Sequence, residues 1–267
     1  MQPTGNSTSS QPLLRLGTNA FHLSLPGAAA DGGAVFVHHP FSPDADVAGE
    51  LATLLTTHTE ALAAAHAPLT VLLPTRYVTV PADDFVANDA EALYRYAISD
   101  DAEPLGAPLF LPELSTYVLF TVPQALDAVV RKYGVPHYRP AATALWQYAQ
   151  RQQAANTPPS LYAYAADESL ELFAVNGNRL KFANRFAASH AHDVLYYILF
   201  VWEQLGLRHE KDRLRLLGML PQEEWLTDRL RTFLLHVEPH AEAELCEACG
   251  TQTTANLPAD LLAAANS

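Results

Sequence analysis

Alternation of apolar and polar residues predicts a pair of strands near the start of the chain. The runs LLRLGTNAFHLSLPG and GAVFVHHPF flank the glycine-rich segment AAADGGA, which indicates a hairpin. Apolar residues then recur at close to helical spacing after Asp44, at Val47, Leu51, Leu54, Leu55 and Leu62. We expect a helix there, followed by two strand-like runs on either side of Pro74–Thr75.

The next part of the chain predicts further short elements. NDAEALYRYAIS reads as a helix with Asn88 or Asp89 as its N-cap, and the proline-rich DDAEPLGAPLFLPEL reads mostly as a loop. STYVLFTVP indicates a buried strand, and QALDAVVRKYG indicates a helix that ends at Gly134. VPHYRP is extended and AATALWQYAQRQQ is helical. The polar RQQAANTPPS, residues 151–160, predicts a linker.

The second half has the clearest pattern. LYAYAADESLELFAVNGNRLKFANRF, from Leu161 to Phe186, predicts three strands joined by two tight turns. A helix over AHDVLYYILFVWEQLGL, a strand over RLRLLGML, a helix that begins near Pro221 and a last strand in LLHVEPH follow. The first half approximates the same order with an additional piece around residues 75–116, although the two halves cannot be aligned as sequences.

These elements predict an α/β protein of two domains, each a mixed sheet with flanking helices. We expect residues 1–12 to be a loose tail, 13–150 the first domain with an inserted subdomain at about 75–116, and 151–160 the linker. Residues 161–240 then form the second domain, and the alanine-rich residues 241–267 are expected to be a disordered tail.

Composition and charge narrow the function. A net charge of −13 argues against nucleic acid as a partner, because binding it requires basic groups that neutralise phosphates. The same charge argues against an acidic membrane surface. MQPTGNSTSSQP has neither a basic region nor an apolar run, so we expect no signal peptide, and no apolar segment approaches the roughly 20 residues of a membrane span. We therefore expect a soluble cytoplasmic protein.

The order of elements resembles the actin-like ATPase superfamily, whose two domains are duplicated ribonuclease H-like folds. The segments VLLPTRYVTVPADDF and STYVLFTVPQALDAVVRKYGVPHYRPAATALWQYAQ look like those of its pilus-assembly branch, in which the second of them crosses to the second domain. The patterns L-x-F-x-N-x-F, D-x-x-Y-Y-I-L and L-x-L-x-G are similar to those of an uncharacterised bacterial family of unknown function. That likeness spans about residues 13–240.

The actin-like resemblance implies where a nucleotide site would lie. In that superfamily the first hairpin of each domain carries a D-x-G-type turn, whose glycine lets backbone N–H groups approach phosphates and whose acid helps to hold the metal's waters. The corresponding turns here are Ala165–Ser169, which has Asp167 but no glycine, and LGTN, which has Gly17 but Asn19 in place of an acid. The adenosine turn would be Leu217-Gly218-Met219, with one glycine.

Two interpretations of these turns follow. Asp167 and Gly218 are the candidate residual nucleotide-binding residues, with Mg-ATP as the alternative cofactor. They are also explained as an ordinary turn acid and a glycine at a strand end. Because all three turns depart from the superfamily's pattern, we expect no bound nucleotide and no cofactor.

Metal and catalytic motifs give no stronger candidate. His190-Ala191-His192-Asp193 is better read as a polar helix entry with an acid near the positive end of the helix dipole than as a metal cluster. Cys246 and Cys249 form a C-x-x-C pair, which would need His236 and His240 to complete a zinc site; we expect a reduced, incidental pair. No nucleophile elbow or P-loop occurs, so we predict no catalytic residue and no metal.

Two residues are candidates for contact with a ligand in the cleft or with a partner. Asn184 alternates with Phe182 and Phe186, so we expect it to be a buried polar group that either caps a turn or meets a ligand. Tyr196 and Tyr197 lie about 100° apart on a helix, which places one in the core and leaves the other, assigned as Tyr197, for a partner.

The sequence thus favours a non-catalytic, actin-like binding or scaffold protein with a protein partner of unknown identity. Homodimerisation is one form that such binding could take, because actin-like relatives in the pilus and division branches pair through comparable surfaces. The alternative is a nucleotide-binding actin-like ATPase with atypical phosphate loops.

Overall fold

The computed structural model describes residues 11–28, 34–42, 44–153, 158–239, 245 and 257–266 of the chain. The chain divides into two compact units. Unit 1 comprises Met1–Phe110, Tyr117–Leu145 and Leu245–Ser267, and unit 2 comprises Leu111–Thr116 and Trp146–Glu244. Cys246, Cys249 and His240, singled out by the sequence, lie outside the described residues, as does part of the expected linker.

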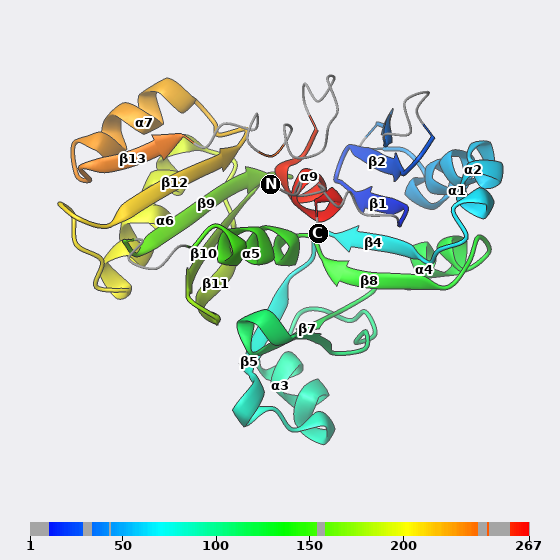
Figure 1. Cartoon of the computed structure of the whole chain (residues 1–267), viewed down its shortest axis with the longest axis horizontal. Coiled ribbons are helices and arrows are strands. Elements are labelled where there is room, and N and C mark those ends of the chain that lie inside the picture. The colour runs from blue at the N-terminus through cyan, green and yellow to red at the C-terminus, as the bar shows by residue number, and fades with distance from the viewer. Residues whose placement is uncertain are drawn as a thin grey trace, which may run out of the picture. The chain divides into compact units, whose positions relative to one another are not determined.

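Unit 1 is built on a five-stranded mixed sheet with the order β3-β2-β1-β4-β8 (Figure 1). Its strands are β1 (Leu13–Leu16), β2 (Ala20–Leu25), β3 (Val35–Pro40), β4 (Leu69–Leu73) and β8 (Pro136–Pro140). The first three strands are antiparallel, and β4 and β8 run parallel to β1. The helices connected to these strands are α1 (Val47–Thr57), α2 (Thr59–Ala64), α4 (Gln124–Val130) and α5 (Ala142–Arg151).

Unit 2 repeats this topology with the order β11-β10-β9-β12-β13. Its strands are β9 (Ser160–Ala166), β10 (Ser169–Asn176), β11 (Arg179–Ala187), β12 (Arg213–Gly218) and β13 (His236–Pro239), and its helices are α6 (Ala191–Gln204) and α7 (Glu223–Arg231). Again three antiparallel strands are followed by two parallel ones. The duplication that the two sequences do not reveal is therefore plain in the strand order.

The core of unit 2 lies between its sheet and the two helices α6 and α7. Apolar residues of α6 recur every three or four positions, so one stripe of the helix is buried, including Val194, Ile198 and Trp202. These side chains pack with Leu172 of β10 and Leu226 of α7. The helix predicted to start near His192 is thus confirmed, and its amphipathic pattern is the reason.

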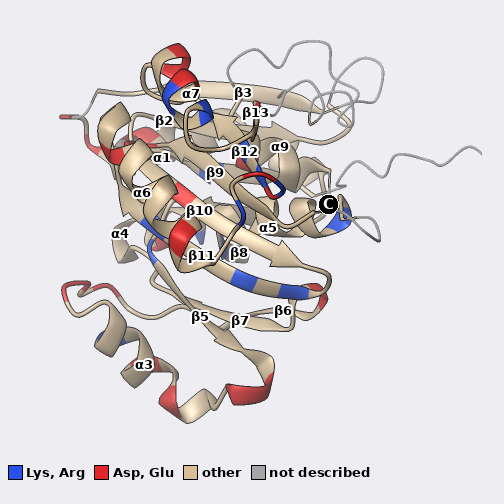
Figure 2. Ribbon diagram, turned by 90° about the vertical axis from the view of Figure 1, so that its left-hand side faces the viewer, with Lys and Arg blue, Asp and Glu red and all other residues tan. Residues whose placement is uncertain are grey.

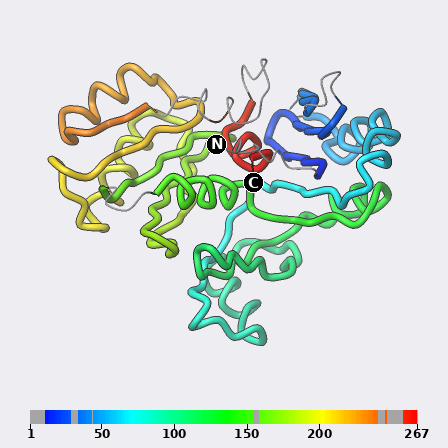
Figure 3. Tube along the Cα trace, in the orientation of Figure 1, coloured from blue at the N-terminus to red at the C-terminus, as the bar shows by residue number. Residues whose placement is uncertain are grey.

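An insert leaves the first sheet after β4 and returns before α4, as the trace in Figure 3 shows. It contains β5 (Tyr77–Pro81), the short 3-10 helices η1 (Ala82–Asp84) and η2 (Ala87–Asp89), α3 (Ala90–Ala97), β6 (Leu109–Leu111), the 3-10 helix η3 (Pro112–Leu114) and β7 (Thr116–Phe120). The three strands form a separate sheet with the order β5-β7-β6. The sequence resemblance placed STYVLFTVP in the main domain, and this was wrong, because β7 is the central strand of the small sheet.

The C-terminal residues contradict the expectation of a disordered tail. Ala259–Ala265 form the helix α9, and every residue of α9 is buried. Within unit 1 the helix packs on β1, where Nε of Arg15 donates to Oδ1 of Asp260 over 2.6 Å. The side chains of this ion pair are 3% and 1% exposed, so each buried charge is stabilised by the other.

Candidate functional site

The two predicted nucleotide residues come together at one end of the unit 2 sheet. Because β12 runs parallel to β9, Gly218 lies opposite Ala165 in the register. Asp167 lies two residues after Ala165, in the turn that joins β9 to β10. The structure therefore places both residues at the same end of the sheet, which is the arrangement that a shared site would need.

The turn itself is a tight two-residue hairpin loop. Asp167 and Glu168 have φ angles of +51° and +53°, the left-handed values that a type I′ turn requires at both central positions. The carbonyl oxygen of Glu168 accepts a hydrogen bond from the backbone N–H of Ala188 over 3.1 Å. The loop is thus compact, carries two side chains where glycine is favoured, and is tied to the end of β11.

Close packing explains why residue 218 is glycine. Its φ of +75° is unfavourable for any residue with a Cβ, and an added Cβ would lie 2.3 Å from the carbonyl oxygen of Ala165 and 2.8 Å from the ring of Tyr164. The backbone of β12 therefore approaches β9 where a side chain has no room. This contact within the sheet accounts for Gly218 without a ligand.

The corresponding turn of unit 1 joins β1 to β2 through Gly17, Thr18 and Asn19. The N–H of Gly17 donates to the carbonyl oxygen of Ala20, and the N–H of Phe41 donates to the carbonyl oxygen of Asn19, each over 2.9 Å. No carboxylate occurs in this turn, so among the three turns that the resemblance identifies only the turn between β9 and β10 carries acids, Asp167 and Glu168.

Asn184 is exposed, and the expectation of a buried polar group was wrong. Asn184 lies on β11 opposite Leu172 of β10, and its Oδ1 accepts a hydrogen bond from the N–H of Arg185 over 2.9 Å. Because β11 is at the edge of the sheet, Phe182 and Phe186 reach only the margin of the core and leave the position between them open to solvent.

One tyrosine of the pair on α6 is half-buried and the other is exposed, as expected. The exposed residue, however, is Tyr196 and not Tyr197. Tyr197 is half-buried and stacks on Phe186 with ring centroids 4.4 Å apart. Tyr196 is 61% exposed. His192, from the polar entry of the same helix, packs on Trp225 at 4.5 Å. In the described part of the chain no three His, Cys, Asp or Glu side chains are grouped to hold a metal ion.

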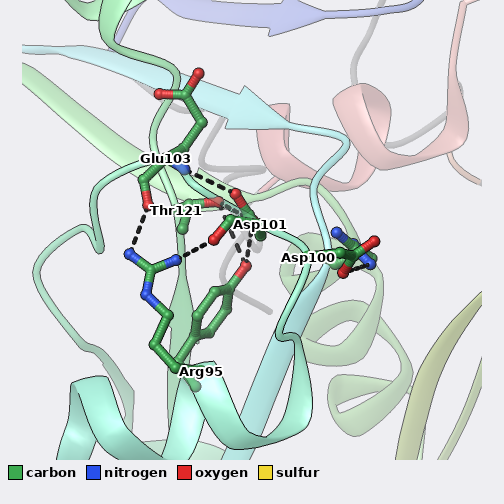
Figure 4. Close-up of polar contacts among 7 residues, drawn as sticks. Arg95, Asp100, Asp101, Glu103 and Thr121 are labelled. Atoms are coloured by element: carbon green, nitrogen blue, oxygen red, sulfur yellow. Dashed lines mark hydrogen bonds and ion pairs between the residues drawn. The ribbon is translucent and has the colours of Figure 1, made fainter.

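Sequence reasoning missed a hydrogen-bond network in the insert, centred on Asp101 (Figure 4). Oδ2 of Asp101 accepts from the hydroxyls of Tyr94 and Thr121, each over 2.7 Å, and Oδ1 accepts from the N–H of Glu103 over 3.0 Å. The guanidinium of Arg95 donates to the carbonyl oxygens of Asp101 and Glu103. Five residues are thereby held in one arrangement: two of α3, two of the segment after it, and Thr121, which directly follows β7.

The network has a clear electrostatic signature. Burial, with the neighbouring Asp101, raises the pKa of Tyr94 to about 12. Burial alone would raise the pKa of Asp101, but the hydrogen bonds from Thr121 and Tyr94 outweigh it and lower that pKa. Asp101 is therefore held as a carboxylate, which suits an acceptor of three hydrogen bonds.

The network also fixes the wall of a cavity in unit 1. Oε2 of Glu103 accepts from the N–H of Gln124 at the start of α4, which ties the segment after Asp101 to that helix. A cavity of about 660 Å³ lies next to this segment. It is lined by residues 104–109 of the insert, by Phe120, Val122, Gln124, Asp127 and Arg131, by residues 136–139 of β8, and by Gln11 and Thr70.

Polar groups converge on this cavity from α4 and β8. The carboxylate of Asp127 accepts from Nε of Arg131 over 2.7 Å and from the hydroxyl of Tyr138 over 2.9 Å. Burial alone would raise the pKa of Asp127, but these two bonds lower it, whereas burial and Asp127 together raise the pKa of Tyr138. Arg131 and His137 are exposed and line the cavity, so each brings N–H groups to it.

β8 itself offers a backbone edge to this cavity. It pairs with β4 on one side and is the last strand of its sheet among the described residues. An edge strand presents unpaired N–H and C=O groups, and these can take up an added strand. The cavity thus combines a volume typical of ligand pockets (about 300–1,000 Å³) with a polar edge and a few fixed side chains.

The comparisons with solved structures identify the fold. A protein of unknown function with an actin-like ATPase fold, from Bacteroides thetaiotaomicron, matches with a TM-score of 0.78 at 18% identity, covering 91% of this chain and 96% of that chain. The type IV pilus biogenesis complex PilM-PilN provides another match, with a TM-score of 0.52 at 18% identity and coverage of 89% and 90%. The fold is therefore that of the actin-like ATPases, as the order of elements predicted.

Family and membrane comparisons complete the assignment. No curated protein matches the chain in sequence. Within the described residues, no helix has both the length and the apolar character that crossing a membrane requires. A family model described as "Protein of unknown function (DUF3822)" matches residues 4–237. The chain belongs to this family of unknown function, whose solved structural neighbours have the actin-like fold.

Proposed function

We propose that the chain is a non-catalytic, actin-like binding module that docks an extended segment of another protein in the cavity beside β8. The observation that carries this proposal is the cavity itself, because it places a free strand edge, exposed donors and a pocket of about 660 Å³ in one unit. The proposal assigns no catalytic residue and no cofactor.

Three features support a protein ligand rather than a hydrolysed nucleotide. The turn at Asp167 and Glu168 is closed and lacks glycine, Gly218 is explained by packing against Ala165, and the unit 1 turn has no acid. Metal-assisted phosphoryl transfer depends on close backbone approach and on carboxylates that orient the metal. Two acids in a tight turn without glycine are a poor substitute for both.

The chemistry of the cavity favours an acidic segment. The stretch from Arg131 to Arg139 contains two arginines, Lys132 and His137 but no acid, in a chain whose net charge is −13. The one carboxylate on α4 that lines the cavity, Asp127, is already engaged by Arg131 and Tyr138. Backbone pairing along β8 would supply affinity, and carboxylates of the segment would find the exposed Arg131 and His137. The similarly folded PilM was solved in a complex with another protein, PilN, which accords with such a role.

Selection from a displayed library of random peptides on the purified full-length chain tests this function. We expect enriched peptides to be acidic and to bind at least about tenfold more weakly to Arg131→Gln, a loss of about 1.4 kcal/mol. Lys132→Gln is the matched control, because Lys132 is the exposed neighbour that does not line the cavity. A cavity-filling Ala107→Trp substitution should abolish binding. Peptides that bind Ala107→Trp as well as the wild type would contradict the proposal.

One observation favours a second candidate, nucleotide binding without hydrolysis. Asp167 and Gly218 do lie at the same end of the unit 2 sheet. In this alternative Asp167 would orient the waters of Mg²⁺, and the backbone at Gly218 would lie beneath the base. Its distinguishing property is stabilisation of the protein by Mg-ATP or Mg-ADP, which Asp167→Asn would remove.

A further inference from the structure

The insert carries a stack of three aromatic rings on its small sheet. Tyr117 of β7 lies between the other two rings, with centroid distances of 3.8 Å to Phe85 and 4.6 Å to Phe110. Phe110 is 44% exposed, and the neighbouring Val86 is 52% exposed. Rigid aromatic groups that remain partly exposed are typical of protein interfaces, because they bury a large apolar area at little cost in side-chain entropy.

The insert that carries this stack is acidic. Residues 77–121 contain eight Asp or Glu residues and a single Arg, a net charge of −7 out of the chain's −13. In Figure 2 the charged positions of the segment that carries α3 are accordingly mostly red. Asp83 and Asp84 are exposed directly before Phe85. We call Asp83, Asp84, Phe85, Phe110 and Tyr117 the insert surface.

Unit 2 has a surface of opposite charge on β11. Arg179 and Lys181 are exposed on this strand, and no Asp or Glu occurs between Glu171 and Asp193 in the sequence. Arg185 of the same strand lies opposite Glu171 of β10. None of the nine residues of β11 is buried, whereas β9 is buried at every position but its last. We call Arg179 and Lys181 the β11 surface.

The edge of β11 carries a bulge that disfavours the addition of another strand. In its register with β10, Leu180 pairs with Val175 and Phe182 pairs with Ala174, so that Lys181 has no opposite residue. Such a bulge with a lysine is a common device that blocks the pairing of edge strands. Lys181 is exposed at this bulge.

We propose that the insert surface of one copy binds the β11 surface of a second copy of this chain. The surfaces are opposite in charge, and Arg179 or Lys181 could lie over the partly exposed rings of Phe85 and Phe110 in cation–π contacts. The net charge of −13 makes copies repel each other, and a local pairing of opposite charge would offset this repulsion. The proposal involves neither the cavity beside β8 nor the turn at Asp167, and it stands independently of both.

Sedimentation velocity of the wild-type chain is the first test. We expect association that grows with protein concentration between about 1 and 100 µM. Dissociation constants in this range are typical of weak specific contacts. Raising the salt from about 0.1 M to about 1 M shortens the Debye length from about 10 Å to about 3 Å and should return the chain to monomer. A monomer at every concentration in low salt would overturn the proposal.

Charge reversal gives a sharper test with a built-in rescue. Asp83→Lys/Asp84→Lys makes both surfaces basic, and Arg179→Glu/Lys181→Glu makes both acidic, so each variant alone should be monomeric. An equal mixture restores opposite charges across the contact and should associate again, which misfolded variants cannot do. The control is Glu223→Lys/Glu224→Lys, an adjacent exposed pair in the first turn of α7, which should behave as the wild type. Equal loss in the control, or no recovery in the mixture, would refute the assignment.

Discussion

Removing either partner of the ion pair between Arg15 and Asp260 should strongly destabilise unit 1. The pair is buried, with side chains 3% and 1% exposed, and it joins β1 to the C-terminal helix α9. Either Arg15→Met or Asp260→Leu leaves the other charge inside the protein without its counter-charge. The helix docks with every residue buried, so this charge would have no route to solvent without undocking α9.

The expected magnitude follows from the cost of an uncompensated buried charge. Breaking a buried ion pair on one side costs about 3–5 kcal/mol, whereas replacing both charges by apolar side chains is close to neutral or even stabilising. At about 2–4 °C per kcal/mol for a chain of this size, each single substitution should lower the melting temperature by roughly 6–20 °C. The double variant Arg15→Met/Asp260→Leu should melt near the wild type.

Circular dichroism melts of the four proteins form a double-mutant cycle, which isolates the interaction between the two side chains. The account requires strong non-additivity, with the double variant far more stable than the sum of the single effects implies. If both single variants stay within about 1 kcal/mol of the wild type, the two charges are solvated in solution and α9 does not dock on β1 as described. If the double variant loses the sum of both effects, the ion pair is not the source of the loss.

Three further substitutions test the turns and the insert network. Gly218→Ala should cost about 2–5 kcal/mol, because strain at positive φ and overpacking against Ala165 add together, and a melt within 2 °C of the wild type would contradict the packing explanation. Glu168→Gly should stabilise the folded protein by about 0.5–1 kcal/mol, because glycine relieves the left-handed strain at the second turn position. Part of this gain is lost because glycine also makes the unfolded chain more flexible. A lower urea midpoint than that of the wild type would refute this prediction. Asp101→Asn should cost about 1–3 kcal/mol at pH 7. The folded pKa of Asp101 lies below its unfolded value of about 3.9, so its contribution is present above that pH and is lost as the pH falls through the folded pKa. The difference between wild type and variant should therefore shrink in melts below about pH 4, and a constant difference would exclude the carboxylate as its cause.

The elements predicted best are those with strong local periodicity. The stripe of Val194, Ile198 and Trp202 and the turns around Asp167 and Gly177 carry their own signals, so the second half was predicted in the right order. The apolar run of β7 indicates a strand but does not reveal which sheet it joins, because strand pairing is a long-range choice.

α9 and the cavity show what local pattern cannot supply. The helix ADLLAAA is buried all round, so it has no polar face to give an amphipathic period, and Asp260 looks like a surface acid until Arg15 is placed beside it. The cavity is assembled from segments between Gln11 and Arg139 that are distant in sequence. Asn184 was misplaced for a related reason, since alternation shows which face a residue shares but not that its strand lies at an edge.

Thermal melting of the full-length chain with Mg-ATP, Mg-ADP or Mg²⁺ alone tests the central claim most directly. A ligand at 100 times its Kd stabilises the folded protein by about 2.7 kcal/mol, a shift of roughly 5–11 °C here. The account predicts no change with either nucleotide, and a rise of this kind with a peptide selected on the cavity. A saturable, Mg²⁺-dependent rise with ATP or ADP that Asp167→Asn removes would contradict it and establish a working nucleotide site.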